Sequence, residues 1–210
     1  MTGDILESIR RQFPGAQVGL ITNPGPSAQH SILLDPALAV EIATFLRDHD
    51  EWCLDYASNV SGVDWPPRKV KEARVRKEVV DGVEKEIKET VEREEPGFLE
   101  AVYHLYSVRK KHGPVVVRMR TADRGTGATL PSLTPVWKSA DFQEREVFDL
   151  YGIRFEGHPD LRRLLMWEEF EDHPMRKDYV APDDFEYEPT PHDEILEKVK
   201  AREAGREPAV

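Results

Sequence analysis

Residues 137–179 read WKSADFQEREVFDLYGIRFEGHPDLRRLLMWEEFEDHPMRKDY, a stretch whose character changes halfway. It begins with the apolar spacing of a helix and continues as a charged run that two His-Pro pairs interrupt. This second part has too few alternating apolar residues to form a core strand. We therefore expect a helix followed by an extended segment that lies on another protein.

The helix is predicted to lie between Asp141 and Gly152. Asp141 is the expected N-cap residue, and Gly152 occupies the position after the last turn where a left-handed residue is common. At about 100° per residue, the helix has an apolar face and a charged face. The apolar face contains Val147, Phe148, Leu150 and Tyr151, and the charged face contains Arg145, Glu146 and Asp149.

Glu144 points into the middle of the apolar face. In one interpretation it completes a capping box by reaching back to the amide of the cap residue. In the other it meets a donor on a partner protein, because a carboxylate on a buried face needs one. Arg145 and Asp149 are expected to pair on a solvated surface, which contributes only about 0.2–0.5 kcal/mol.

Two similar units follow a short extended run at residues 153–155. Residues 156–163 read EGHPDLRR and residues 171–178 read EDHPMRKD. Proline disfavours the helical conformation of the residue before it, so His158 and His173 are expected in bends. We expect both histidines to donate hydrogen bonds across an interface. Adjacent cations follow each bend, and the planar donor fork of arginine suits carboxylates and carbonyls at interfaces.

These residues resemble the signature of the 30-kDa subunit family of respiratory complex I, which in bacteria is NADH-quinone oxidoreductase. The similarity runs without a gap from Glu144 to Leu165 and includes GHPDLRR. The second bend resembles the family's Gly-His-Pro-Leu-Arg-Lys-Asp-Tyr/Phe-Pro element. This chain departs from that element at Asp172, Met175 and Val180.

The resemblance implies a cofactor-free structural subunit in the peripheral arm of proton-translocating NADH-quinone oxidoreductase. Such a protein clamps the large, 49-kDa-like quinone-site subunit and lies near the iron–sulfur subunits. FMN and Fe-S clusters would then lie in partner subunits and carry electrons from NADH to quinone. The implied location is peripheral, at the cytoplasmic face of the bacterial inner membrane, with membrane contact only through the complex.

The expected interface consists of the charged helix residues, both His-Pro bends and the residues that follow them. Its members are Glu144, Arg145, Glu146, Asp149, His158, Pro159, Arg162, Arg163, His173, Pro174, Arg176, Lys177, Asp178 and Tyr179. We expect no catalytic, cofactor-binding or metal-binding residue in this chain. The subunit hypothesis also predicts that the chain from residue 137 onward stays mobile until its partner binds.

Two alternatives remain open. The chain could be the equivalent component of a related membrane hydrogenase or ferredoxin-driven complex. It could also be a free-standing enzyme that uses His158 or His173. These histidines are 15 positions apart, unlike the close spacing of most metal ligands. The sequence also lacks a serine elbow, paired cysteines and an HExxH motif.

Composition limits the other classes of function. The 210 residues carry a net charge of −11, which disfavours nucleic acid and anionic lipid as direct partners. No run approaches the roughly 20 apolar residues that span a bilayer, and the first residues do not resemble a secretory signal. Cys53 is the single cysteine, so the chain cannot form an internal disulfide or supply the roughly four ligands of an iron–sulfur cluster.

We predict an α+β fold in which residues 1–136 form a small antiparallel sheet with helices on one face. Residues 66–97 are a charged insertion for which we favour a β-hairpin or flexible arm, because Asp81-Gly82 indicates a turn. The competing helix is suggested by valine and isoleucine at every fourth position. Residues 122–130 are expected to be a flexible connection. Residues 137–180 form the signature helix and interface segment, and residues 181–210 form an acidic tail with a terminal helix at 191–203.

Overall fold

The structure is a computed structural model that describes residues 1–80 and 83–180, and the side chains of these residues outside 71–91. The predicted Asp81-Gly82 turn, the acidic tail and the helix expected at 191–203 lie outside the described residues. Residues Met1–Asp178 form one compact unit, so the helix at 141–151 and the segment after it belong to the same unit as the sheet. Among the described helices, none has the length and hydrophobicity that crossing a bilayer requires.

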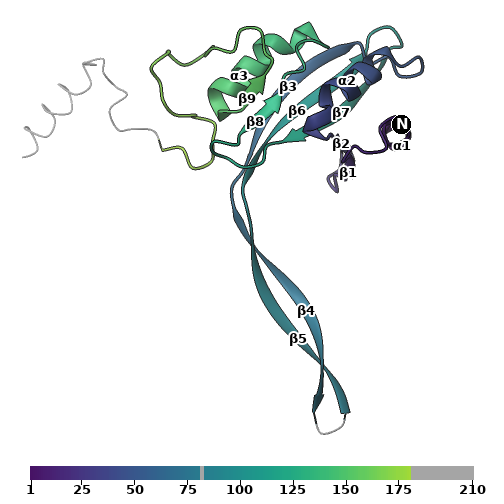
Figure 1. Cartoon of the computed structure of the whole chain (residues 1–210), viewed down its shortest axis with the longest axis vertical. Coiled ribbons are helices and arrows are strands. Elements are labelled where there is room, and N and C mark those ends of the chain that lie inside the picture. The colour runs from purple at the N-terminus through teal and green to yellow at the C-terminus, as the bar shows by residue number, and fades with distance from the viewer. Residues whose placement is uncertain (81–82, 181–210) are drawn as a thin grey trace, which may run out of the picture. The chain divides into compact units, whose positions relative to one another are not determined.

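Figure 1 shows the order of the helices and strands along the chain. The first half contains α1 (Thr2–Gln12), β1 (Gly19–Ile21), β2 (Ser31–Leu33), the 3-10 helix η1 (Pro36–Leu38), α2 (Ala39–Asp48), β3 (Tyr56–Trp65) and β4 (Arg68–Val80). The second half contains β5 (Val83–Glu95), β6 (Phe98–Ser107), β7 (His112–Arg120), β8 (Thr129–Pro131), the 3-10 helix η2 (Lys138–Ala140), α3 (Asp141–Tyr151) and β9 (Arg154–Glu156). The predicted α+β class is confirmed in this mixed arrangement.

The main sheet has five strands in the order β1-β2-β7-β6-β3. Strands β2 and β7 are parallel, whereas the other neighbours are antiparallel, so the prediction of an antiparallel sheet is wrong at this pair. The connection through η1 and α2 lets β3 run in the same direction as β2. Strands β3 and β7 are both antiparallel to β6, so β7 also runs in the direction of β2. Asp35 caps the start of this connection, because its carboxylate accepts a hydrogen bond of 3.1 Å from the Ala37 amide.

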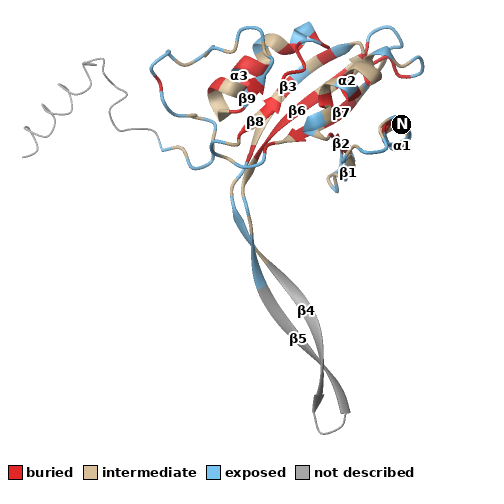
Figure 2. Ribbon diagram, viewed as in Figure 1, coloured by how far each residue is buried: buried red, intermediate tan, exposed pale blue. Residues whose placement is uncertain are grey.

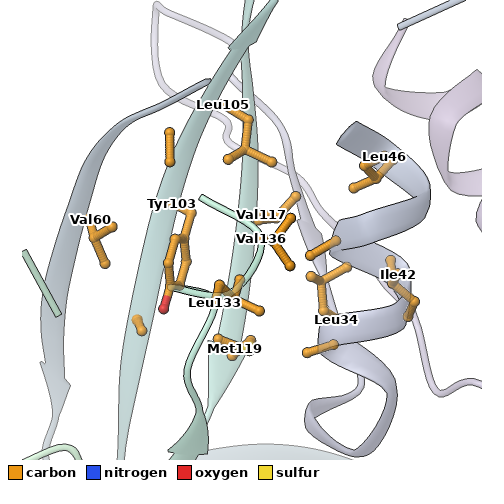
Figure 3. Packing of buried hydrophobic residues seen from close by; sticks show 14 of the residues in the cluster. Leu34, Ile42, Leu46, Val60, Tyr103, Leu105, Val117, Met119, Leu133 and Val136 are labelled. Atoms are coloured by element: carbon orange, nitrogen blue, oxygen red, sulfur yellow. The ribbon is translucent and has the colours of Figure 1, made fainter. Parts of the chain in front are cut away.

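One hydrophobic core holds the compact unit together. Side chains from β6, β7 and α2 meet there, together with residues of the segment before η2 (Figure 3). The labelled members are Leu34, Ile42, Leu46, Val60, Tyr103, Leu105, Val117, Met119, Leu133 and Val136. Fully burying one such aliphatic side chain contributes about 1.5–3 kcal/mol. Figure 2 shows that buried residues gather on the sheet and on α3.

Strands β4 and β5 form the antiparallel hairpin favoured for the charged insertion. Their register runs from Arg68 opposite Glu95 to Val80 opposite Val83, and the two strands pair only with each other among the described strands. A four-residue apolar repeat is also a multiple of the two-residue strand period, so the repeat did not by itself exclude strands.

The connection at residues 122–130 is not the flexible loop that we expected. Asp123 accepts hydrogen bonds from the amides of Gly125 and Gly127, at 2.7 and 3.0 Å. Strand β8 follows and pairs in parallel with β9, with Leu130 opposite Phe155. Both of these side chains are buried. This small second sheet anchors the chain directly after α3.

Candidate functional site

Helix α3 packs along the edge strand β3. The side-chain oxygen of Gln143 accepts a hydrogen bond of 2.6 Å from the Val60 amide, a group that would otherwise be open at the sheet edge. Gly62 allows the close approach, because a Cβ atom there would collide with the ring of Tyr151. The helix is therefore a fixed part of the domain, and its charged face can position the segment that follows.

The ends of α3 agree with the prediction at one terminus only. Gly152 follows the helix with φ of +77°, and its amide donates to the Phe148 carbonyl. At the other end the N-cap residue is Ala140, which makes no side-chain cap hydrogen bond, so Asp141 is not the cap. The preceding turn η2 runs directly into the helix, which leaves no place for the predicted capping box.

Glu144 is fully buried, and both interpretations of its role are wrong. Its carboxylate accepts hydrogen bonds from the Tyr103 hydroxyl at 2.9 Å, the Ser132 hydroxyl at 2.6 Å and the Leu133 amide at 2.8 Å. The Thr134 hydroxyl adds a fourth at 3.2 Å. The donors that a buried carboxylate requires thus come from the same chain.

The environment of Glu144 shifts two pKa values upward. Burial raises the pKa of the Glu144 carboxyl, although its hydrogen bonds from Ser132, Leu133 and Tyr103 partly oppose the rise. Burial also raises the pKa of Tyr103 well above its usual value, and the nearby Glu144 carboxylate adds to this. Because burying a charge costs several kcal/mol, removing these donors would destabilise the domain.

Asp149 is also fully buried, and it does not pair with Arg145 on a solvated surface as predicted. Its Oδ2 atom accepts hydrogen bonds from three successive amides, those of Leu164, Leu165 and Met166, at 2.9, 2.6 and 2.9 Å. Its Oδ1 atom lies 2.7 Å from the guanidinium of Arg163. One carboxylate thus fixes the middle of the segment at residues 157–178, which we call the bend segment.

Two opposing effects act on the pKa of Asp149. Burial acts to raise it, but the hydrogen bonds from the three amides and from Arg163 outweigh burial, so the pKa is lowered. The bound carboxylate therefore stays ionised down to more acidic pH than a free one. Its charge holds the bend segment over the whole neutral range.

Arg145 supports the bend segment from the neighbouring turn of α3. It is buried, and its guanidinium donates to the carbonyls of Arg162 and Arg163 at 3.2 and 3.4 Å. Asp160 lies 3.7 Å from the same group. Arg145 and Asp149, which were predicted to pair, instead hold the same segment, Arg145 through its carbonyls and Asp149 through its amides.

The two histidines of the bends bond to their own chain, where we expected bonds across an interface. His158 Nε2 lies 3.1 Å from the Asp141 carbonyl, and its Nδ1 accepts from the Asp160 amide, also at 3.1 Å. His173 Nδ1 lies 3.0 Å from the Asp149 carbonyl. Burial lowers the pKa of His173, so the neutral ring is favoured. Both rings help to fix the bends against α3.

The second bend is attached at the C-terminal end of α3 and at β3. Arg176 donates to the Tyr151 carbonyl at 2.7 Å, and the Met175 amide donates to the Leu150 carbonyl at 3.1 Å. The Lys177 amide donates to the buried Asp64 carboxylate at 2.8 Å.

Arg124, which secures the end of this bend, was not among the predicted site residues. Its guanidinium bonds both oxygens of Asp64, at 2.7 and 2.8 Å, and both oxygens of Asp178, at 3.0 and 2.8 Å. These hydrogen bonds raise the pKa of Arg124, and the same contact lowers the pKa of Asp178. Arg124 lies in the glycine-rich loop, where a single cation has no recognisable pattern.

A second residue that was not predicted is the carboxylate Glu100, near the start of β6. It is fully buried and accepts hydrogen bonds from the Trp65 indole and from Arg118 and Arg120, at 2.7, 3.1 and 2.7 Å. The sequence shows two arginines at alternating positions, Arg118 and Arg120, but it does not show that their strand β7 lies beside β6.

Several predicted interface residues keep exposed surface. They are Glu146, Pro159, Arg162, Lys177 and Asp178, while His158, Arg163, His173, Pro174, Arg176 and Tyr179 are half-buried. The Arg162 side chain is 71% exposed and its guanidinium lies 2.9 Å from Asp160. Contact of these residues with a partner remains a prediction. Across the described residues, no three His, Cys, Asp or Glu side chains are grouped so that they could hold a metal ion.

Comparison with known proteins gives consistent results. A family model described as respiratory-chain NADH dehydrogenase, 30 Kd subunit, matches residues 32–185. A NADH-quinone oxidoreductase subunit of Rhizobium meliloti (strain 1021) is 38% identical over 169 residues, which are 79% of this chain and 74% of that protein. The NADH-quinone oxidoreductase subunit of Roseiflexus castenholzii (strain DSM 13941 / HLO8) is 33% identical over 174 residues, or 83% and 81% of the two chains.

The chain spans only part of the length of several relatives, and its fold resembles one solved structure. The chain spans 60% of the length of the Rhizobium etli (strain CIAT 652) relative and 66% of the Coxiella burnetii relatives. A chain of the membrane-bound sulfane sulfur reductase, an archaeal respiratory membrane complex, superposes with a TM-score of 0.58 at 18% identity and covers 88% of each chain. This last likeness concerns the fold alone.

Proposed function

The chain belongs to the family of the 30-kDa subunit of respiratory-chain NADH dehydrogenase, and from this premise we propose that it is a structural subunit of the NADH-quinone oxidoreductase complex. In this proposal it holds the large quinone-site subunit in place beside the iron–sulfur subunits. FMN and Fe-S clusters belong to those partners. The chain reaches the cytoplasmic face of the membrane only through them.

The observation that carries the proposal is the support of the bend segment. Asp149, Arg145 and the Asp64–Arg124 pair hold it on the domain through buried polar contacts. The segment has hardly any regular secondary structure, yet its backbone is tied at three places. A surface fixed in this way before assembly loses little conformational entropy on binding. This differs from our expectation of a chain that is mobile from residue 137 onward, because residues 137–178 lie in the compact unit.

Rigid support is the physical contribution that we assign to this chain. Electrons pass between redox centres at rates that fall steeply with distance, so a complex that transfers them needs fixed spacing between its subunits. A protein that contributes a preformed surface can fix the position of its neighbours without taking part in the chemistry itself.

Purification of the tagged full chain from its source organism tests the proposal. After mild detergent extraction, we expect the chain to be recovered with flavin- and iron–sulfur-containing subunits and with NADH-quinone oxidoreductase activity. The chain purified alone should show neither property. Recovery with hydrogenase subunits would support the alternative membrane complex, and recovery as a free protein with its own turnover would contradict both.

A matched pair of variants separates partner contact from internal support. Arg162→Ala removes an exposed guanidinium, so it should lower assembly only if that group contacts the partner. Arg163→Ala removes the ion pair to buried Asp149, so it should also destabilise the isolated chain. The recovered partner subunits and the thermal midpoint of each isolated variant distinguish the two effects.

A further inference from the structure

One turn of the bend segment is built around a buried charge. Residues 163–167, which we call the docking turn, wrap the Asp149 carboxylate so that three successive amides meet one oxygen atom at 2.6–2.9 Å. Arg163 closes the other side of the carboxylate at 2.7 Å. Because these amides must all point at one fixed atom, the backbone conformation of the turn is defined by the domain.

This defined turn carries apolar side chains into solvent. Leu165 is 57% exposed, Trp167 is 51% exposed and Leu164 is 37% exposed. The Trp167 ring meets the buried Phe170 ring edge to face, with centroids 4.8 Å apart, and Arg163 lies 5.6 Å from the Phe170 ring centroid. The indole therefore has a supported position. A single exposed leucine needs no explanation, but several large apolar groups on one anchored turn indicate a binding surface.

Acidic residues directly follow these apolar side chains. Glu168, Glu169, Glu171 and Asp172 are all exposed. An apolar centre beside a charged rim is the usual composition of a protein–protein interface, and tryptophan is enriched among the residues that contribute most to binding.

We propose that the docking turn inserts into an apolar pocket of another protein of the complex, and that lysine or arginine residues line the rim of this pocket. The inference rests on the proposed function, because the pocket belongs to another subunit of the proposed complex. The exposed acids select a basic rim by charge complementarity. They also argue against a second copy of this chain and against anionic lipid, since either would place like charges together.

Site-specific photo-crosslinking in the full chain tests the proposed contact. A photoreactive residue at position 165 should crosslink to one partner protein, at an apolar stretch flanked by Lys or Arg. The same residue at position 108 is the control, because Val108 is 65% exposed but lies in the turn between β6 and β7. Crosslinks from position 165 to an acidic surface or to a second copy, or a yield no higher than from position 108, would overturn the proposal.

Substitution of the apolar side chains provides a second test. The double variant Leu165→Ser, Trp167→Ala should lower the recovery of partner subunits about tenfold or more, as expected for central interface residues. Its thermal midpoint as an isolated chain should stay near that of the wild type, since both side chains are half-exposed or more. The control Val108→Ser should leave recovery unchanged.

Charge reversal tests the rim separately. The variant Glu168→Lys, Glu169→Lys should lower recovery at low salt, and the difference from wild type should shrink at high salt because mobile ions screen rim charges. If the wild-type chain recovers the oxidoreductase subunits and the Leu165→Ser, Trp167→Ala variant recovers them equally well, the docking-turn proposal is wrong and the proposed function stands. If the wild-type chain recovers none of these subunits, both proposals fail.

Discussion

The β4–β5 hairpin and the bend segment are both rich in charged residues, but they depend on the domain to different degrees. The hairpin is a regular ladder of two 13-residue strands that pair with each other. The bend segment is almost without regular structure, yet Asp149, Asp64 and Arg124 fix it to the domain. In the hairpin, the ion pairs of Arg68 with Glu95 and of Lys69 with Glu94 join side chains that are 38–78% exposed.

This difference shows what makes a charged segment part of a domain. A salt bridge between solvent-exposed side chains contributes roughly 0–1 kcal/mol. A buried carboxylate that loses its partners costs several times more, because its charge cannot return to water while the fold persists. The number of charges in a segment is thus a poor guide to its order, and the burial of their partners is a better one.

The strongest test of the comparison is Asp149→Ala. This change leaves three amides and the Arg163 guanidinium without their buried acceptor, so we expect a loss of about 3–5 kcal/mol in the free energy of unfolding. Denaturant unfolding measures the loss, and limited proteolysis should show new cleavage within residues 157–178. A change below about 0.5 kcal/mol, the size typical of ordinary surface substitutions, would mean that the bend segment is no better supported than the hairpin.

The variant Arg124→Met tests the second attachment with a smaller expected effect. Asp64 keeps the Lys177 amide but loses its bidentate partner, and we expect a cost of about 2 kcal/mol. Hydrogen exchange of the Lys177 amide should accelerate, because its acceptor is less well held. The exposed Arg162→Ala serves as the control and should leave this exchange rate unchanged.

The pH dependence of stability should reveal His173 in the bend segment. Burial, with Arg176 and Arg163 adding to it, lowers the pKa of His173 below 6.5, so the unfolded chain binds its proton more readily. The free energy of unfolding should therefore fall as the pH drops from 6.5 towards the folded pKa. Above pH 6.5 the neutral His173 ring makes its full contribution to stability. His173→Asn should flatten this slope. Part of the slope should remain, because burial also lowers the pKa of His104. An unchanged slope in the variant would contradict the assignment.

Shortening the hairpin should have the smallest effect. Lys69 and Glu94 face each other in the register, so an Asn-Gly turn can replace residues 70–93 between them. Because β4 and β5 pair only with each other among the described strands, we expect the unfolding midpoint of the remaining domain to change little. A large loss of stability would show that the hairpin supports the domain and would remove the contrast with the bend segment.

Local patterns in the sequence predicted several elements correctly. The left-handed Gly152 after α3 and the hairpin at residues 66–97 follow from signals within a few adjacent residues. The family signature was also recognisable, because it lies in one continuous stretch that the family model includes. At the candidate site, the errors concern charged residues. Glu144 was assigned to a capping box or to a donor on a partner, and Asp149 to a surface pair. Both are buried among donors of their own chain.

The sequence by itself determined the family, the α+β class, the helix before Gly152 and the hairpin at residues 66–97, because each depends on spacing between neighbouring residues. Only the tertiary structure decided which carboxylates are buried and what they hold. Arg124 and Lys177 reach Asp64 from 60 and 113 positions away. The partner of a charge is chosen by the packing of distant elements, and burial then decides whether that contact contributes a few tenths of a kcal/mol or several kcal/mol.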